Sequence, residues 1–186
     1  SFWGGRVIEQ PVDVSAVDSP APAQVYASYG LASEADDGIL RFELPLADGN
    51  YQVRLHFVEP DYEEAGQRVF DVWLQDNLAV SEFDIADAAG GKLKATTLTL
   101  PVSVAAGHGL SIELRNRIEV AILSAIEVFQ GSIPATNPSA IIEASRDQGT
   151  TWETVSTAAP MDRYGHGQFA WQVPANWETN TNSVKV

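Results

Sequence analysis

The chain has 186 residues, enough for one domain or for one domain with part of another, and its 45% hydrophobic content is ample for a core. Its 25 acidic residues outnumber 11 basic ones, and the resulting net charge of −14 repels phosphate backbones, so we expect no nucleic-acid partner. With no cysteine there is no disulfide framework and no thiolate metal site. No apolar run approaches the roughly 20 residues of a bilayer-spanning helix, so we expect no membrane span.

Short segments of alternating hydrophobicity follow one another along the chain, separated by turn formers such as Asp48-Gly49-Asn50 and Gly107-His108-Gly109. The predicted strands are residues 39–46, 50–58, 68–74, 78–85, 95–104, 109–116 and 121–129. Helix-tolerant patches are short, at residues 33–37 and 86–89. Many short strands without a long helix predict an all-β fold, an antiparallel β-sandwich of the jelly-roll type.

The segment 50–58 has the clearest period of two. Tyr51, Val53, Leu55 and Phe57 form its inward set, whereas Gln52, Arg54 and His56 face the other way, as in a half-buried strand. The same parity assigns further residues to the core: Leu40, Phe42, Leu44, Phe70, Val72, Leu74, Ile112, Leu114, Ile122, Ile126 and Val128.

Residues 49–72 resemble the malectin-like carbohydrate-binding domains. The core of that family reads roughly G-x-Y-x-V-x-L-x-F-x-E, then a short aromatic loop, then G-Q-R-x-F-D-V. The matching positions are Gly49, Tyr51, Val53, Leu55, Phe57, Glu59, Gly66, Gln67, Arg68, Phe70, Asp71 and Val72. The resemblance extends to VYASYG at 25–30, EFDIADAAG at 82–90 and VAILSAIEV at 120–128. It implies an extracellular or cell-surface β-sandwich, residues 1–131, that binds oligo- or polysaccharides.

The resemblance also implies the sugar site, because in this family a pyranose lies against aromatic rings of loops at one end of the sandwich. Carried over by motif, the carbohydrate-binding residues are Tyr26, Tyr29, Asp61, Tyr62 and Asn116, with Arg117 as an alternative to Asn116. The family has an aromatic pair where Asp61-Tyr62 stand, so one ring is missing here. The alternative for Tyr26 is a core position in an edge strand, with its hydroxyl reaching solvent. For Arg68 and Asp71 we expect structural ion pairs.

We expect no enzymatic activity. Glu59, Asp61, Glu63 and Glu64 could supply the two carboxylates of a glycoside hydrolase, yet acidic loops are common in so acidic a chain. His56, His108 and His166 lack the spacing of a zinc site, and no G-x-S-x-G or phosphate-binding glycine motif is present.

No cofactor is expected, although acidic loops leave a structural calcium ion open as an alternative. The candidate ligands are Glu34, Asp36 and Asp37 in one cluster, and Asp84 and Asp87 in another. Neither cluster has the pattern of an EF-hand.

A linker is predicted at residues 132–139, followed by part of a second β-sandwich at 140–186, with strands in 140–156, 168–177 and 183–186. Within it, SRDQGTTW at 145–152 matches the Asp-box hairpin. In that motif Asp147 caps the turn, Gly149 supplies an unusual backbone dihedral and Trp152 packs underneath. The motif is structural, and this chain has one copy.

Relative to the family, we expect a first strand ahead of residue 2 to be missing, either because the chain is a fragment or because a neighbouring chain supplies the strand. This observation supports the alternative function, a structural or adhesive protein–protein module with a decayed sugar site. Its partners would be neighbouring β-domains or further copies of the chain.

Overall fold

The computed structural model describes residues 4–32, 37–131, 138–161, 165 and 167–174, together with the backbone of 183–185. The chain divides into two compact units, Ser1–Ile133 and Pro134–Val186. In the described parts of the chain, no helix is long and apolar enough to cross a membrane.

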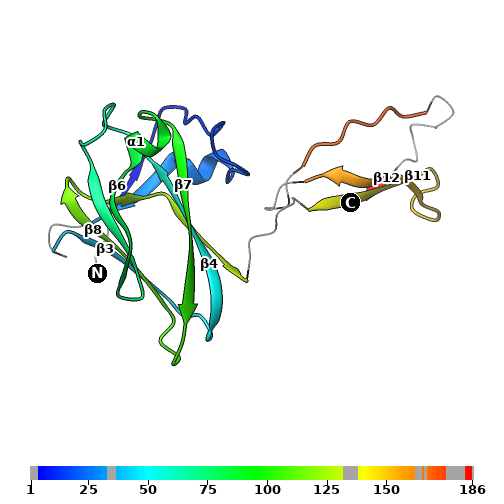
Figure 1. Ribbon diagram of the computed structural model, residues 1–186. Coiled ribbons are helices and arrows are strands. Elements are labelled where there is room, and N and C mark those ends of the chain that lie inside the picture. The colour runs from blue at the N-terminus through cyan, green and yellow to red at the C-terminus, as the bar shows by residue number, and fades with distance from the viewer. Residues whose placement is uncertain are drawn as a thin grey trace. The chain divides into compact units, whose positions relative to one another are not determined.

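The strands of the first unit pair in antiparallel sheets (Figure 1). One sheet has the order β3-β8-β5-β6, with β3 at Ile39–Leu44, β8 at Leu110–Ile118, β5 at Val69–Leu74 and β6 at Asn77–Asp84. A second has the order β10-β4-β7, with β10 at Ala125–Gln130, β4 at Gly49–Val58 and β7 at Ala95–Val104. A small sheet has the order β1-β2-β9, with β1 at Gly4–Val7, β2 at Ser28–Leu31 and β9 at Ile122–Leu123. A 3-10 helix, η1 (Ala23–Ala27), and a short helix, α1 (Ile85–Ala89), complete the unit.

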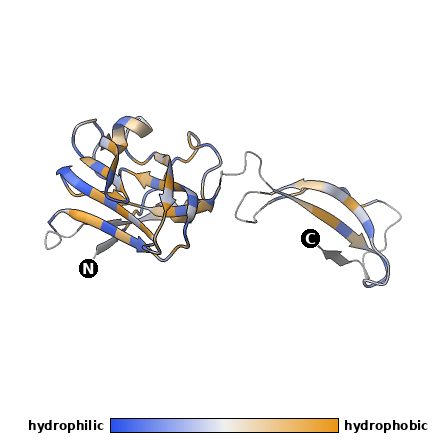
Figure 2. Cartoon of the chain, turned by 60° about the horizontal axis from the view of Figure 1, so that its bottom comes forward, coloured by the Kyte–Doolittle hydropathy of each residue, from blue (hydrophilic) through white to orange (hydrophobic). Residues whose placement is uncertain are grey.

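Aromatic side chains join the two larger sheets. The ring of Phe57 on β4 lies 5.9 Å from that of Phe70 on β5 and 5.0 Å from that of Phe83 on β6, measured between centroids. Figure 2 shows the alternation of hydrophobic and hydrophilic residues along these strands. The inward set predicted for residues 50–58 is confirmed as buried. Of the other predicted core residues, seven are buried: Leu40, Phe70, Val72, Leu74, Ile112, Leu114 and Ile122. Phe42, Leu44, Ile126 and Val128 are half-buried.

The second face of β4 is buried as well, so the prediction of a half-buried strand is wrong. Arg54 is 6% exposed and His56 is fully buried. The reason is the segment between β1 and β2, which lies over this face: Arg54 Nη2 donates to the carbonyl of Asp18, and His56 contacts Tyr26 of η1. Alternation along one strand cannot reveal a cover supplied by a distant segment.

Element boundaries differ from the prediction at two places. The segment 121–129 is divided into β9 and β10, which belong to different sheets, and β1 and β2 were not predicted. The helix predicted at 86–89 is confirmed as α1: the Asp84 side chain accepts the N–H of Asp87 at its start, and Gly90, with φ of +74°, ends it. Of the patch 33–37, all but Asp37 lies outside the described residues.

The second unit contains a hairpin of β11 (Ser139–Ser145) and β12 (Glu153–Pro160), and β13 (Ser183–Lys185) pairs with the other edge of β11. Residues 168–174 were predicted as strand but form none, and the strand that pairs with the second edge of β11 is β13. At the hairpin turn, Asp147 accepts the N–H and the hydroxyl of Thr151 (2.8 and 2.6 Å), and Gly149 has φ of +91°. The indole N–H of Trp152 donates to the Gly149 carbonyl, so this turn has the geometry that its sequence predicts.

Candidate functional site

The loop that follows β4 is held in shape by the side chain of Glu59. Its Oε1 accepts the backbone N–H groups of Asp61 (3.0 Å) and Tyr62 (3.2 Å), and the side chain has no exposed surface. A buried carboxylate that accepts two N–H groups fixes the turn around it. Asp61 and Tyr62 therefore leave the sheet in a defined direction.

Arg68, which precedes β5, pairs with Glu59 from the other end of the same loop. Its Nε donates to Glu59 Oε2 at 2.7 Å, Nη1 donates to the carbonyl of Val120, and Nη2 lies 3.3 Å from Asp61 Oδ2. Such a buried pair persists because each charge is matched and hydrogen-bonded. The structural role predicted for Arg68 is confirmed: its guanidinium joins the loop, β5 and the segment after β8.

Tyr62 is half-buried, and the guanidinium carbon of Arg68 lies 5.0 Å from its ring centroid. This distance is within the range of a cation–π interaction. Desolvation raises the pKa of the Tyr62 hydroxyl, and the nearby negative charge of Glu119 raises it further. Arg68 thus lies over the ring of Tyr62, and Glu119 lies near its hydroxyl.

Tyr29 on β2 lies beside the same loop. Burial raises the pKa of its hydroxyl, and the negative charge of Asp61 adds to the shift. Tyr29 is 7% exposed, whereas the side chain of Asp61 is 54% exposed. The structure therefore brings three of the predicted residues together, Tyr29, Asp61 and Tyr62, although only the last two present substantial surface.

Tyr26 has no exposed surface, which is inconsistent with the prediction that its ring stacks on a sugar. Its hydroxyl lies 2.8 Å from Nδ1 of His56 and accepts the N–H of Ala21. On the far side of the imidazole, Nε2 lies 3.2 Å from Oε2 of Glu127, although not aligned as a hydrogen bond. Tyr26 thus anchors η1 to β4. The alternative is right that Tyr26 belongs to the core, but the residue lies in a 3-10 helix and not in an edge strand, and its hydroxyl is buried.

Asn116 is not in direct contact with the tyrosines. Its side-chain oxygen accepts the N–H of Ala121 at 2.7 Å, and its backbone N–H donates to the carbonyl of Gly38. The alternative residue, Arg117, pairs with Asp71 at 2.7 Å, which confirms the structural role predicted for Asp71 and lowers the pKa of that carboxyl. Both side chains therefore shape the segment 117–121 that carries Glu119.

Glu119 is the residue that the sequence reasoning missed. It is exposed, has φ of +58° and directly precedes the VAILSAIEV motif. The motif indicated the correct segment. Within that segment, the side chain near Tyr62 belongs to Glu119, three residues after the predicted Asn116. The sequence motif does not specify the backbone path of the turn that places it there.

Two of the carboxylates considered for catalysis or metal binding, Glu59 and Asp84, hold loops. Glu59 is buried against Arg68, and Asp84 accepts the N–H groups of Asp87 and Gly66. Among the described residues no group of three or more His, Cys, Asp or Glu side chains is arranged to hold a metal ion. Glu34, Asp36 and His166 lie outside the described residues.

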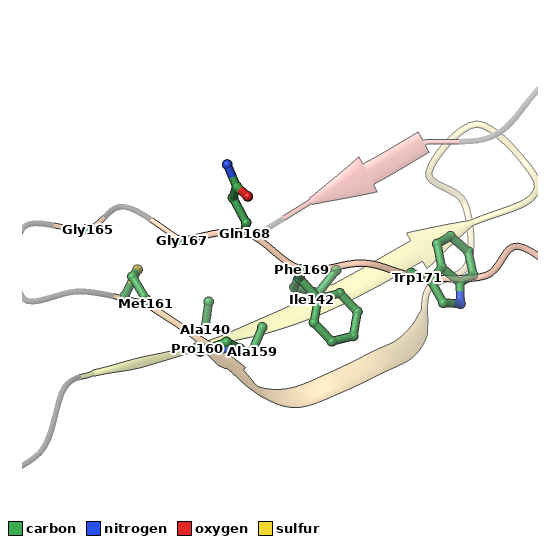
Figure 3. Close-up of a pocket in the computed structure, with 10 residues that line it drawn as sticks. All are labelled: Ala140, Ile142, Ala159, Pro160, Met161, Gly165, Gly167, Gln168, Phe169 and Trp171. Atoms are coloured by element: carbon green, nitrogen blue, oxygen red, sulfur yellow. The ribbon is translucent and has the colours of Figure 1, made fainter.

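The second unit has a pocket of about 570 Å³ on the hairpin (Figure 3). Its lining includes Ile142, Met161, Gln168, Phe169 and Trp171, with Phe169 next to Ile142. None of the predicted site residues lines this pocket.

The chain belongs to the malectin domain family, whose family model matches residues 15–132. An LRR receptor-like serine/threonine-protein kinase of Arabidopsis thaliana is 32% identical over 150 residues, which cover 72% of this chain and 16% of the kinase. Receptor-like protein 4 of the same plant is 35% identical over 113 residues, which cover 59% of this chain and 18% of that protein. The chain thus spans less than a fifth of the length of these relatives.

Solved plant ectodomains share the fold. The ANX1 ectodomain from Arabidopsis thaliana superimposes with a TM-score of 0.58 at 18% identity, over 68% of this chain and 38% of that one. A structure of the plant peptide RALF23 in complex with FER and LLG2 gives a TM-score of 0.50 at 18% identity, over 69% and 40%. The malectin-like resemblance and the all-β prediction are confirmed. The domain is a non-catalytic binding module of the extracellular or cell-surface kind.

Proposed function

We propose that the first unit binds an oligo- or polysaccharide at the loop end of its sandwich, through Tyr62 and Asp61 with Tyr29 at their edge. The observation that supports this most directly is the conformation of the loop: a buried ion pair fixes its base, while the side chain of Asp61 remains 54% exposed and Tyr62 is half-exposed. An aromatic ring beside an exposed carboxylate suits a pyranose, whose C–H face packs on the ring while its hydroxyls donate to the carboxylate.

Affinity for a single sugar is expected to be modest. The exposed aromatic surface is small, because Tyr26 is buried and Tyr29 is 7% exposed. Hydroxyl contacts to Asp61 are open to water and gain little free energy over hydration. Useful affinity would then come from several copies of the domain binding one polysaccharide.

A glycan array with the whole chain tests the proposal. We expect a defined set of saccharides to bind, and Tyr62→Ala to abolish this binding while the far-UV circular dichroism spectrum is retained. Tyr51→Phe is the matched control. It removes a tyrosine hydroxyl that donates to the Ala47 carbonyl, and Tyr51 is not part of the proposed sugar site. A folded wild-type chain that binds no glycan, or a Tyr62→Ala variant that binds normally, contradicts the proposal.

A protein–protein module is the second candidate. The small exposed aromatic surface near the loop supports it. A structure with the same fold was also solved in complex with a peptide and a further protein, which supports it as well. Sedimentation velocity across a hundredfold range of concentration checks for self-association of this chain. If no glycan on the array binds and the chain self-associates as its concentration rises, the protein–protein module is favoured. If the chain is a monomer that binds glycans, saccharide binding is favoured.

A further inference from the structure

Arg68 contacts Tyr62 and several other groups, but little of its side chain reaches solvent. It is 4% exposed, and each of its three nitrogens has a partner: Glu59 for Nε, the Val120 carbonyl for Nη1, and Glu59 with Asp61 for Nη2. A guanidinium with its donors committed in this way has little capacity left for a ligand.

The same guanidinium lies over one face of the Tyr62 ring, at 5.0 Å from the centroid. The face that is left for a sugar is therefore the opposite one, and the ring as a whole is half-exposed. Because Arg68 also neutralises Glu59, whose Oε1 accepts the N–H groups of Asp61 and Tyr62, it supports the backbone of both residues as well as the ring.

From these contacts we infer that Arg68 is the positioning residue of the proposed sugar site: it holds Tyr62 with one face open and does not itself bind the ligand. This inference rests on the proposed function for its ligand, but its effect on the loop can be measured without one. Lysine retains the charge and can still pair with Glu59. It cannot also reach Val120 and lie flat over the ring, because a single ammonium replaces the planar fork.

The test compares Arg68→Lys with the wild-type chain by amide hydrogen exchange and by affinity for the strongest glycan of the array. We expect exchange at the amides of Asp61 and Tyr62 to accelerate about tenfold or more, with exchange in β4 and β8 unchanged, and affinity to fall about tenfold. Arg115→Lys is the matched control. Arg115 also lies over an aromatic ring, 4.0 Å from the centroid of Trp73, but both residues belong to strands, β8 and β5, and not to the loop.

If amide exchange at residues 61 and 62 is unchanged in the Arg68→Lys variant, the inference is wrong, and the proposed function is unaffected. Exchange that accelerates equally in all strands also overturns it, since that result indicates a general structural role. If the variant loses affinity only at low salt, and its amide exchange is unchanged, Arg68 is instead a direct ligand for an acidic sugar.

If Arg68→Lys does not fold, the double variant Glu59→Gln with Arg68→Gln, which removes both buried charges, is compared with the wild-type chain in the same way. If no glycan binds the wild-type chain, the proposed function is wrong. Amide exchange at residues 61 and 62 still shows whether Arg68 positions the loop.

Discussion

At the scale of single residues, the buried polar side chains account for most of the organisation around the site. Glu59, Arg68 and His56 are each less than 5% exposed, and each contacts a residue from another segment of the chain. Burial of such groups is tolerated because their partners replace water. A change that removes one partner consequently affects stability more than the modest net contribution of a hydrogen bond suggests.

Tyr26→Phe is expected to lower the free energy of unfolding by about 1–3 kcal/mol, because the buried Nδ1 of His56 loses the hydroxyl that lies 2.8 Å away. Urea denaturation measures the change. Tyr51→Phe removes a hydroxyl that bonds to a partly buried carbonyl and should cost less. Equal losses in the two variants would contradict the importance assigned to the Tyr26–His56 contact.

At the scale of elements, the turns fix which strands pair. Gly107 and Gly109 in the turn between β7 and β8 both have positive φ, +69° and +73°. They differ in their surroundings: a Cβ at Gly109 would lie 2.5 Å from the carbonyl oxygen of Leu44, whereas a Cβ at Gly107 would meet nothing within 4 Å. Gly109 is therefore required by close backbone approach as well as by its dihedral angle.

Gly109→Ala is expected to destabilise the chain more than Gly107→Ala does. The Gly107 variant introduces about 1 kcal/mol of left-handed strain, and the Gly109 variant adds a clash with backbone that cannot move without disturbing β3. Thermal denaturation of the two variants gives the difference. Similar melting temperatures would show that the turn relaxes and that the close approach carries no cost.

The hairpin between β11 and β12 should be sensitive to acid. Hydrogen bonds from the side chain and backbone of Thr151 lower the pKa of Asp147 from 3.8 to about 2. Because the folded-state pKa is the lower one, the contribution to stability is complete above about pH 4 and is lost as the pH falls toward 2. Amide exchange at Thr151 should accelerate over this range, and Asp147→Asn should remove most of the pH dependence. A flat profile in the wild-type chain would contradict the assignment.

At the scale of the whole molecule, the residues of the proposed site all lie on one unit of an acidic chain. Residues Tyr29, Asp61, Tyr62 and Glu119 all belong to the first unit. Arg41, Arg68, Arg115 and Arg117 are each within 4.0 Å of a carboxylate, and the net charge of −14 already includes these four cations.

A chain that ends at Gly131 is expected to keep the sandwich and to bind the same glycans with affinity within about twofold of the whole chain, because every residue of the proposed site belongs to the first unit. Circular dichroism and the glycan array check the two properties. Folding with loss of binding would mean that residues beyond 131 contribute to recognition.

Much of the sandwich could be predicted because alternation specifies which residues share a face of a strand. The period of two in residues 50–58 identified the buried row Tyr51, Val53, Leu55 and Phe57, and the ordered motif that follows identified the loop with Asp61 and Tyr62. Both features are local, since they depend on strand geometry and on contacts within the loop that connects β4 to β5, although these two strands lie in different sheets and do not pair with each other.

The tertiary structure decided which surfaces remain open. Tyr26 is buried because His56, 30 residues further along the chain, lies beneath it, and the second face of β4 is covered because a distant segment folds over it. Glu119 reaches Tyr62 through a turn whose path the motif does not specify. The sequence by itself determined the fold class, the acidic charge and the loop of the site. Which tyrosines are exposed and which are buried was decided by the tertiary structure, because burial depends on contacts between segments that are far apart in the chain.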